Sequence, residues 1–413
     1  MQNNAAVKIL IHSINYFPEL TGIGKYSGEM AEWLSSRGHE IRVVAAPPYY
    51  PEWKVGRDYS GARYSREAIR GVNVFRCPLW VPKKPSGLKR IIHLASFALS
   101  SLPVMLGQVF WKPDIVFVVE PPLFCLPGAW LVARLSGAKA WLHVQDFEVD
   151  AAFDLGILPA GKIRNIVLFT ERCMMRRFDR VSTISTKMME KLEKKGVIRN
   201  KTSLFPNWVD TEAIFPREAS AMRKELRIPE EEIVCLYSGN MAEKQGLEIL
   251  IEAVRLLKEE KSIRFVLCGD GSARERLYGS ANDLSNIVWL PLQPADKLND
   301  LLNMADIHLL PQRADTEDLV MPSKLAGMLA SGKPILATAR AGTEIAQALE
   351  KCGKLVEPGD ARGLADAIFQ LAGNMPLRKS LGERARNHAV EHLDRDVVLS
   401  AFEDGLRSVV ARI

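Results

Sequence analysis

The sequence has little cysteine, and its cysteines form no pattern. Six of them are scattered over 413 residues, with no CxxC pair. Zinc sites and disulfide frameworks use regular, short spacings, so this distribution argues against both and favours a reducing compartment. The first six residues are polar and lead directly into an apolar segment, without the regions of a secretory signal peptide. We therefore expect a cytoplasmic location.

Long uninterrupted hydrophobic runs are also missing. A membrane-spanning helix needs about 20 predominantly apolar residues. The longest apolar stretch, residues 88–111, falls short because polar residues and a proline interrupt it. The preferred interpretation is a long buried crossover helix, and a membrane-spanning helix is the alternative. The interrupting residues are Lys89, Arg90, His93, Pro103 and Gln108.

Acidic residues are scarce in the first half of the chain. Residues 1–205 hold 29 Lys and Arg against 17 Asp and Glu, a net charge of +12, whereas the remainder carries −6. This asymmetry predicts that the first half faces an anionic partner. Nucleic acid is not expected, because the basic residues form no aromatic-interleaved patch. An anionic membrane surface is expected instead, and the basic residues next to the apolar stretch are Lys83, Lys84, Lys89 and Arg90.

The chain is longer than one hydrophobic core usually supports, so two domains are expected. In each half, short apolar segments alternate with segments of helical periodicity, as parallel strands covered by helices require. The predicted fold class is α/β, with two Rossmann-like doubly wound domains facing a central cleft. The predicted divisions are a first domain (1–205), a proline-containing linker (206–216), a second domain (217–390) and a C-terminal helix packing back on the first domain (391–413).

Individual strands are expected at the apolar segments. The long region 47–73 is rich in Pro, Tyr and Arg and has no periodicity, so we expect a functional loop there. In the first half the strands are expected near residues 7–14, 40–46, 114–119, 140–144 and 180–184. In the second half they are expected near 233–237, 264–268, 286–290, 306–310 and 334–338.

Gly22 and Gly24 follow the first predicted strand and open a helix, as in a dinucleotide-binding loop. The third glycine is missing, because Ser27 occupies its place and Gly28 comes one residue late. A tight turn between strand and helix explains the pattern equally well. In both cases, backbone N–H groups at a helix N-terminus suit an anionic oxygen.

A phosphate cradle is predicted after the first strand of the second half. Gly239 lets the backbone approach a ligand, Asn240 offers an amide donor, and Lys244 offers a positive charge. An ordinary surface position is the alternative for Lys244. Gly269 ends the next strand in a glycine-rich turn that is typical of a switch-point loop.

A second cradle is predicted at residues 321–325, Met-Pro-Ser-Lys-Leu, which precede a helix. Ser323 is expected to cap this helix, and the amides of its first turn would then point into the cleft. A well-capped helix without a ligand is the alternative interpretation.

Nine segments, taken in order, resemble the retaining glycosyltransferases of family four, which have the GT-B fold. The resemblance is strongest to the branch that acts in bacterial exopolysaccharide synthesis. The segments cover nearly the whole chain, and each falls where the strand, loop and helix pattern places it. They are TGIGKYSGE, HVQD, PNWVD, YSGNMAEKQG, LCGDG, LPLQPADKL, ADIHLLPQ, MPSKL and ASGKP.

The resemblance implies a role for each matching residue. Gly22 and Gly24 would lie near the donor diphosphate and the acceptor. Asn240 and Lys244 would bind the diphosphate, and Gln293 would face the nucleotide base. The residues that would hold the donor sugar, phosphate and ribose are Pro322, Ser323 and Lys324.

Many members of the family carry a Glu-x7-Glu pair that this chain lacks. Leu319 and Gly327 occupy the two places, so ribose recognition must use another group. Glu317 or Asp318 could replace the first carboxylate.

The predicted catalytic loop departs from the family pattern as well. Many members place a histidine where this chain has Gln145, and His143 lies two residues earlier, within the predicted strand. Asp146 then becomes the best polar candidate in the loop, and a turn or helix cap is its alternative role. The series Asp146-x-Glu148-x-Asp150 resembles metal-binding carboxylates, but it lies away from the predicted diphosphate site, so no metal is expected.

The resemblance implies transfer of a sugar, with retention, from a UDP- or GDP-sugar to a lipid-diphosphate-linked saccharide. Fucose or an N-acetylated sugar is the expected group, and the enzyme would associate peripherally with the inner face of the cytoplasmic membrane. Two other functions stay open from the residues alone. A noncatalytic sugar-nucleotide-binding partner would explain the missing Glu pair. An NAD-dependent dehydrogenase would explain Gly22 and Gly24, but not the second half.

Overall fold

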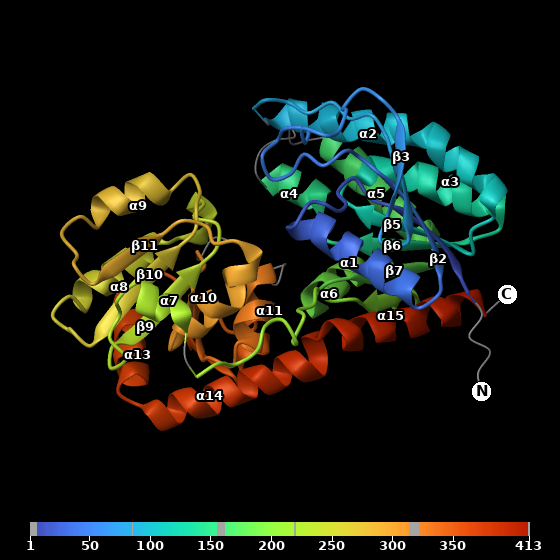
Figure 1. Cartoon of the computed structure of the whole chain (residues 1–413). Helices are drawn as coiled ribbons and strands as arrows, with labels where there is room; N and C mark the ends of the chain where they lie inside the picture. Colours follow the sequence, from blue (N-terminus) through green and yellow to red (C-terminus); the bar gives the residue numbers. More distant parts are fainter. Residues whose placement is uncertain (1–5, 85, 155–161, 219, 314–321, 412–413) are drawn as a thin grey trace. The chain divides into compact units, whose positions relative to one another are not determined.

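The computed structural model describes residues 6–84, 86–154, 162–218, 220–313 and 322–411. Its internal contacts divide the chain into two compact units. The first unit runs to Pro206 and includes the residues from Leu399 onward, and the second unit runs from Asn207 to Val398 (Figure 1). The residues predicted to form a separate linker, from 207 onward, therefore lie within the second unit.

An eight-stranded sheet forms the centre of the first unit. Its order is β3-β4-β2-β1-β5-β6-β7-β8, and every neighbouring pair is parallel except β3 and β4. The strands are β1 (Lys8–His12), β2 (Glu40–Ala45), β3 (Ser65–Ile69), β4 (Val72–Arg76), β5 (Ile115–Glu120), β6 (Lys139–Val144), β7 (Arg180–Thr183) and β8 (Thr202–Leu204).

Helices cover both faces of this sheet (Figure 1). Residues of β5 are buried along their whole length, as the doubly apolar sequence predicted. The helices are α1 (Gly22–Ser36), α2 (Gly87–Gly107), α3 (Leu126–Ser136), α4 (Glu148–Asp154), α5 (Lys162–Arg177), α6 (Thr186–Lys194) and α15 (Arg395–Val410), with short 3₁₀ turns at η1 (Gln108–Trp111), η2 (Leu123–Cys125) and η3 (Arg199–Lys201).

The prediction of one long loop over residues 47–73 is wrong at its end. β3 and β4 form an antiparallel hairpin there, with Ile69 paired to Val72. Three of the five β3 residues are exposed, so the strand carries almost no hydrophobic signal. The buried guanidinium of Arg76 holds the hairpin in place by donating to Glu67 at 2.6 Å and to the Ala46 carbonyl at 2.9 Å.

The interpretation of residues 88–111 as a crossover helix is confirmed, since α2 connects the parallel strands β4 and β5, but the expectation that this helix is buried is wrong. Only one stripe of α2, at steps of four residues, is buried against the sheet; it consists of His93, Phe97, Ser101 and Met105. The opposite side is apolar and exposed, at steps of four and seven residues that keep it on one face. We call this surface the α2 apolar face; it consists of Leu88, Ile92, Leu99 and Leu106.

The segment Gly87–Trp111 is long and apolar enough to cross a membrane, and 22% of its most apolar window is buried. Because its buried stripe belongs to the core of the first unit, the helix is packed onto that unit.

The other face of the first sheet is completed by the C-terminal end of the chain. Phe402 of α15 stacks on Phe205 with ring centroids 4.1 Å apart, and it meets the edges of Phe117 and Trp141. Nearby, the buried carboxylate of Glu403 bonds the His39 ring at 3.0 Å. The last helix is therefore part of the first unit's core.

The second unit has a six-stranded, fully parallel sheet in the order β11-β10-β9-β12-β13-β14. Its strands are β9 (Ile233–Ser238), β10 (Ile263–Cys268), β11 (Ile287–Leu290), β12 (Ile307–Leu310), β13 (Ile335–Thr338) and β14 (Gly353–Val356). Its helices are α7 (Ala221–Glu225), α8 (Glu248–Leu256), α9 (Arg274–Ser280), α10 (Leu298–Met304), α11 (Ser323–Ala330), α12 (Glu344–Leu349), α13 (Ala361–Ala372) and α14 (Met375–His388). The α/β fold class with parallel sheets is confirmed in both units.

We predict that Phe402→Ala destabilises the first unit by about 3–5 kcal/mol, because it removes a buried aromatic ring and leaves a cavity. Urea unfolding followed by tryptophan fluorescence measures this unit, since six of the eight tryptophans precede residue 206. Asp404→Ala, an exposed neighbour on α15, is the control and should stay within about 0.5 kcal/mol of wild type. Equal stability of the two variants would show that α15 does not complete this core.

Candidate functional site

Two glycine turns touch each other at the carboxyl ends of β9 and β10. A Cβ atom on Gly269 would lie 1.9 Å from the Gly239 carbonyl oxygen, and both glycines have positive φ angles, 150° and 143°. The Gly239 N–H donates to the Cys268 carbonyl at 3.0 Å, which joins the two turns. Only glycine allows this backbone contact. The structure therefore brings these two predicted donor-binding residues together.

Asn240 follows this contact and is exposed. Its carbonyl accepts a hydrogen bond from the Tyr237 hydroxyl at 2.6 Å, and a Cβ on Gly271 would lie 2.6 Å from its side-chain Oδ1. The backbone is thus held from below, while the residue itself remains accessible at the edge of the sheet. This is the placement that a donor to a ligand requires.

Lys324 is the most unusual residue of this region. Its Nζ lies 4.2 Å from the centroid of the Tyr237 ring and is buried, and it finds no hydrogen-bond acceptor among the described residues. A Cβ on Gly239 would lie 3.6 Å from the same nitrogen. Burial lowers the pKa of Lys324 to about 7. A buried cation without a partner is costly, so this position favours an anion beside Gly239.

The helix that carries Lys324 begins differently from the prediction. Ser323 is the first residue of α11 and is exposed, and Pro322 stands at the capping position without a side-chain hydrogen bond. The expectation that Ser323 caps the helix is therefore wrong. Because Pro322 has no side-chain acceptor, no side chain satisfies the first amides of this helix from the capping position.

Gln293 and Lys244 are two further residues that were predicted to bind the donor. Gln293 is partly buried and donates to the Pro291 carbonyl at 3.0 Å. The backbone of Lys244 lies in the short turn η4 (Glu243–Gln245), but its side chain lies outside the described part of the structure. Four other residues named in the sequence analysis also lie outside the described part of the structure: Glu317, Asp318, Leu319 and Met321.

In the first unit, Gly22 opens α1 with a φ of 55°. Gly24 has a structural explanation, since a Cβ there would lie 2.6 Å from the Cβ of Glu19. The Glu19 carboxylate accepts hydrogen bonds from the Tyr49 and Tyr50 amides at 2.8 and 2.9 Å. No local pattern in the sequence could indicate this anchor, because the two amides are about 30 residues away from Glu19.

The residues predicted for the catalytic loop, at the end of β6 and just after it, differ in their exposure to solvent. His143 is buried, its Nδ1 is 2.9 Å from the Ser182 hydroxyl, and burial lowers its pKa to about 3. Its other ring nitrogen lies 2.8 Å from the Gln145 amide. His143 is thus a neutral part of the core network, whereas Asp146 is exposed at the loop.

The two carboxylates after Asp146 point into the protein. Glu148 accepts a hydrogen bond from the Leu123 amide at 3.1 Å, and burial raises its pKa to about 7. Asp150 pairs with Lys195 at 2.7 Å, and Lys195 also bonds the buried Glu171. Structural pairing therefore explains Glu148 and Asp150, and only Asp146 of the series remains as a surface candidate.

A group that sequence reasoning missed lies next to this series. Glu120, the last residue of β5, is fully buried, and neither carboxyl oxygen has a hydrogen-bond partner among the described residues. Burial and the neighbouring carboxylates of Glu171 and Glu148 raise the pKa of Glu120 well above its usual value. Its contacts are made by segments far apart in sequence, so no local pattern could have indicated them. Among the described residues, no three His, Cys, Asp or Glu side chains are grouped as metal ligands would be.

Comparison with known proteins connects these observations to a family. Residues 21–208 match the model of a glycosyl transferase 4-like domain, and residues 218–388 match the model of glycosyl transferases group 1. The chain is 44% identical over 412 residues to the putative colanic acid biosynthesis glycosyl transferase WcaI of Escherichia coli K12. That alignment covers 97% of this chain and 100% of WcaI.

Solved structures show the same fold at low sequence identity. Sucrose-phosphate synthase from Thermosynechococcus elongatus superposes with a TM-score of 0.76 at 16% identity, over 98% of this chain and 99% of the other. HepE of Anabaena, in complex with UDP and glucose, superposes with a TM-score of 0.71 at 14% identity, over 97% of this chain and 100% of the other. The resemblance inferred from the motifs and the GT-B fold are therefore confirmed.

We predict that Glu148→Gln gains stability relative to wild type as the pH rises from 5 to 8. The folded-state pKa of Glu148, about 7, lies above its unfolded value, so its stabilising contribution is complete at low pH and is lost as the pH rises. The difference between the two proteins should grow by about 2–3 kcal/mol over this range. Urea unfolding at several pH values measures it, with the exposed Glu52→Gln as control. A constant difference across the range would contradict the burial of this carboxyl.

Proposed function

The chain belongs to the GT-B glycosyltransferases that join a 4-like domain to a group 1 domain, and from that membership we propose its reaction. The reaction is the transfer of a sugar, with retention, from a UDP- or GDP-sugar to a lipid-diphosphate-linked saccharide. The similarity to WcaI supports a place in exopolysaccharide synthesis of the colanic acid type. The UDP and glucose bound by HepE support a nucleoside diphosphate sugar as donor.

The observation that carries this proposal is the buried Nζ of Lys324 beside Gly239, which has no hydrogen-bond partner among the described residues. The carboxyl ends of parallel strands are where doubly wound domains bind ligands. At this edge, a buried positive charge, a glycine turn and the uncapped start of α11 lie together. A nucleoside diphosphate supplies the negative charge that this arrangement lacks. Asn240 and Lys244 are proposed to bind the same diphosphate.

The chemistry follows from where charge develops. The bond between the sugar C1 and the donor phosphate oxygen breaks as a bond forms from C1 to the acceptor hydroxyl on the same face. The departing phosphate oxygen takes the acceptor's proton. Donors and positive charge on the diphosphate stabilise this step, so a strong protein base is not required. We propose that no metal ion is needed, and that Asp146 orients the acceptor or stabilises the cationic sugar.

A membrane-bound acceptor fits the surface of the first unit. The α2 apolar face adjoins the basic residues Lys83, Lys84, Lys89 and Arg90, all of which are exposed. Exposed apolar side chains beside positive charge are typical of segments that lie on anionic membranes. We propose that the enzyme docks there reversibly, on the inner face of the cytoplasmic membrane.

Product analysis tests the function directly. The protein is incubated with a panel of UDP- and GDP-sugars and lipid-diphosphate acceptors, and the products are identified by mass spectrometry and by the NMR coupling of the new anomeric proton. A glycosylated lipid with the donor's anomeric configuration is expected, and EDTA should not reduce its yield. Binding of the nucleotide without transfer or hydrolysis would favour a noncatalytic partner. Stabilisation by a dinucleotide alone would favour a dehydrogenase.

We predict that Lys324→Met stabilises the free protein and weakens UDP or GDP binding. The variant removes a buried amino group that has no hydrogen-bond partner in the described part of the chain, and it keeps the length of the side chain. The lost charge-assisted contact should lower turnover by about 2–4 kcal/mol of transition-state stabilisation. Thermal melting with and without nucleotide measures both effects, and the exposed Lys258→Met is the control. Unchanged nucleotide affinity would remove Lys324 from the donor site.

The number of protons taken up when the nucleotide binds gives a second test of Lys324. The pKa of Lys324 is lowered to about 7, so much of this side chain is neutral at pH 8 in the free protein. A diphosphate beside it favours the charged form. Nucleotide binding at pH 8 should therefore take up a proton in wild type and not in Lys324→Met. Calorimetry in two buffers of different ionisation enthalpy detects this uptake.

We predict that replacing Lys83, Lys84, Lys89 and Arg90 with Gln weakens binding to anionic vesicles. Each basic residue near an anionic surface contributes about 1 kcal/mol, and salt screens the attraction. Co-sedimentation with vesicles that contain phosphatidylglycerol measures it, and neutral phosphatidylcholine vesicles are the control. Equal binding of wild type to neutral and anionic vesicles, or to neither, would reject electrostatic docking.

A further inference from the structure

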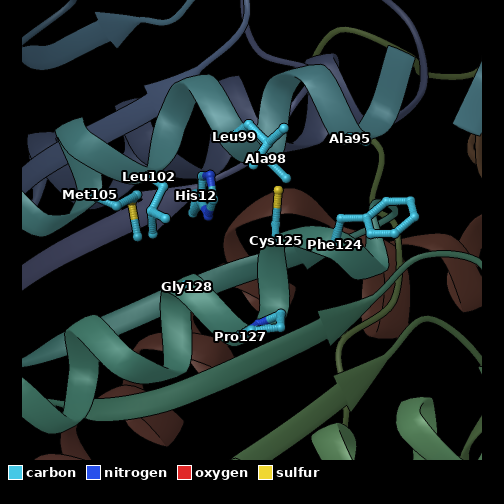
Figure 2. Close-up of a pocket in the computed structure, with 10 residues that line it drawn as sticks. All are labelled: His12, Ala95, Ala98, Leu99, Leu102, Met105, Phe124, Cys125, Pro127 and Gly128. Carbon is cyan, nitrogen blue, oxygen red and sulfur yellow. The ribbon is translucent and has the colours of Figure 1, made fainter. Parts of the chain in front are cut away.

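An apolar cavity of about 280 Å³ lies in the first unit between α2 and the start of α3 (Figure 2). The side chains from the two helices face each other across it, and none of the lining residues carries an acidic or strongly basic group. The α2 side is formed by Ala95, Ala98, Leu99, Leu102 and Met105, and the other side by Phe124, Cys125, Pro127 and Gly128.

Among the described residues that line this cavity, His12 is the only one with a nitrogen or oxygen in its side chain. It is buried, its Nε2 lies 2.9 Å from the Ser101 hydroxyl, and its Nδ1 has no hydrogen-bond partner in the described part of the chain. Burial lowers the pKa of His12 to about 3, so the ring is neutral. The lining residues therefore offer an anion no positive charge, and their mostly apolar side chains suit a hydrocarbon occupant.

The cavity lies at the edge of the sheet where ligands bind in this architecture. His12 is the last residue of β1, and η2 begins three residues after the end of β5. Asp146 follows β6, the neighbour of β5, at the same carboxyl edge. Doubly wound domains bind substrates outside these strand ends, so the cavity is next to the place where an acceptor would lie.

The cavity is also connected to the α2 apolar face. Leu99 and Phe124 both line it and remain 72% and 49% exposed. The basic residue Arg90 lies nine residues before Leu99, about 14 Å along the helix axis. An apolar cavity of about 150 Å³ can hold a benzene ring. The present cavity can therefore hold part of one hydrocarbon chain, but not the two chains of a phospholipid side by side.

We propose that this cavity binds the single hydrocarbon chain of the acceptor lipid, which it receives from the membrane at the α2 apolar face. The proposal rests on the lipid-linked acceptor of the proposed function. The basic residues near Arg90 would hold the anionic headgroup, and the cavity would fix the chain beside the catalytic edge. Specificity for the acceptor's chain would then reside between α2 and α3.

Methyl NMR of the full-length protein tests the proposal, with Met105 as the reporter inside the cavity. The protein is labelled with [¹³C-methyl]methionine, and the Met105 signal is assigned through Met105→Leu. Geranyl diphosphate, which has one short branched chain, is the probe, and monomeric dihexanoyl phosphatidylglycerol is the two-chain comparison. Ala98→Phe places a ring in the cavity, and Ala401→Phe is a matched control at an exposed position of α15.

The expected result is a saturable shift of the Met105 signal with geranyl diphosphate in wild type and in Ala401→Phe. In Ala98→Phe the affinity should be at least about tenfold weaker, while salt-dependent vesicle binding remains. No shift in folded wild type, or an equal shift in Ala98→Phe, would overturn the proposal. If Ala98→Phe does not fold, Gly128→Leu fills the cavity from α3, since a Cβ there would lie 3.1 Å from Leu102.

Other occupants give different outcomes. An equal shift with dihexanoyl phosphatidylglycerol would assign the cavity to membrane lipid and overturn the choice of the acceptor. A dimer that Ala98→Phe dissociates in sedimentation, without any effect of lipid, would assign it to a second copy of the chain. Loss of vesicle binding in the four-Gln variant, with the Met105 shift retained, separates membrane docking from chain binding. Absence of sugar transfer, with the shift retained, leaves the cavity's ligand intact and rejects the reaction instead.

Discussion

One buried amino group, without a hydrogen-bond partner among the residues that the structure describes, lies at the centre of the donor edge of the second unit. The ammonium of Lys324 is buried over the Tyr237 ring, and the hydroxyl of that same tyrosine holds the Asn240 backbone. The turn at Gly239 passes so close to the lysine that a side chain there would crowd it, and the turn at Gly269 packs on Gly239 in turn. Each of these features is costly by itself: a desolvated cation, two turns restricted to glycine, and a helix without a side-chain cap. Together they form the site that we propose binds the donor diphosphate.

In the first unit, the acidic side chains near the catalytic loop that point into the protein either favour the protonated form or are paired with a lysine. At the carboxyl ends of β5 and β6, Glu120 and Glu148 are buried where the protonated form is favoured, and Asp150 is neutralised by Lys195. Of these four carboxylates only Asp146 is exposed. The other three therefore add little repulsion of an anionic acceptor. Its apolar cavity adds a contact that is independent of charge.

Much of this architecture could be predicted because parallel strands leave a strong local signal. β5 and β9 are apolar on both faces. The glycine turns at Gly239 and Gly269 follow β9 and β10 directly in sequence. The hairpin of β3 and β4 was missed because its edge strand is short and mostly exposed, and its stability comes from Arg76. The exposure of α2 could not be predicted, because the apolar residues of its two sides look the same in sequence. The roles predicted for Gln293 and Lys244 stay predictions.

The position of Lys324 was predicted, but its burial was not, since Tyr237 lies 87 residues earlier in the chain. The same limit applies to Glu19, Glu120 and Glu148, whose environments are built from several strands and loops. Sequence patterns indicated which residues could do chemistry. Only the packing of distant segments shows which of them are accessible and which are structural.

The aromatic cluster of Phe117, Trp141, Phe205 and Phe402 has a consequence for synthesis of the protein. The first three residues emerge from the ribosome early, but Phe402 lies near the end of the chain, after the whole second unit. The part of the first sheet that Phe402 covers therefore stays exposed while almost 200 further residues are translated. During this interval the second unit can fold as a continuous segment, whereas the first unit exposes apolar surface of the kind that chaperones bind. The first unit is therefore the first to be synthesised and the last to have its core completed.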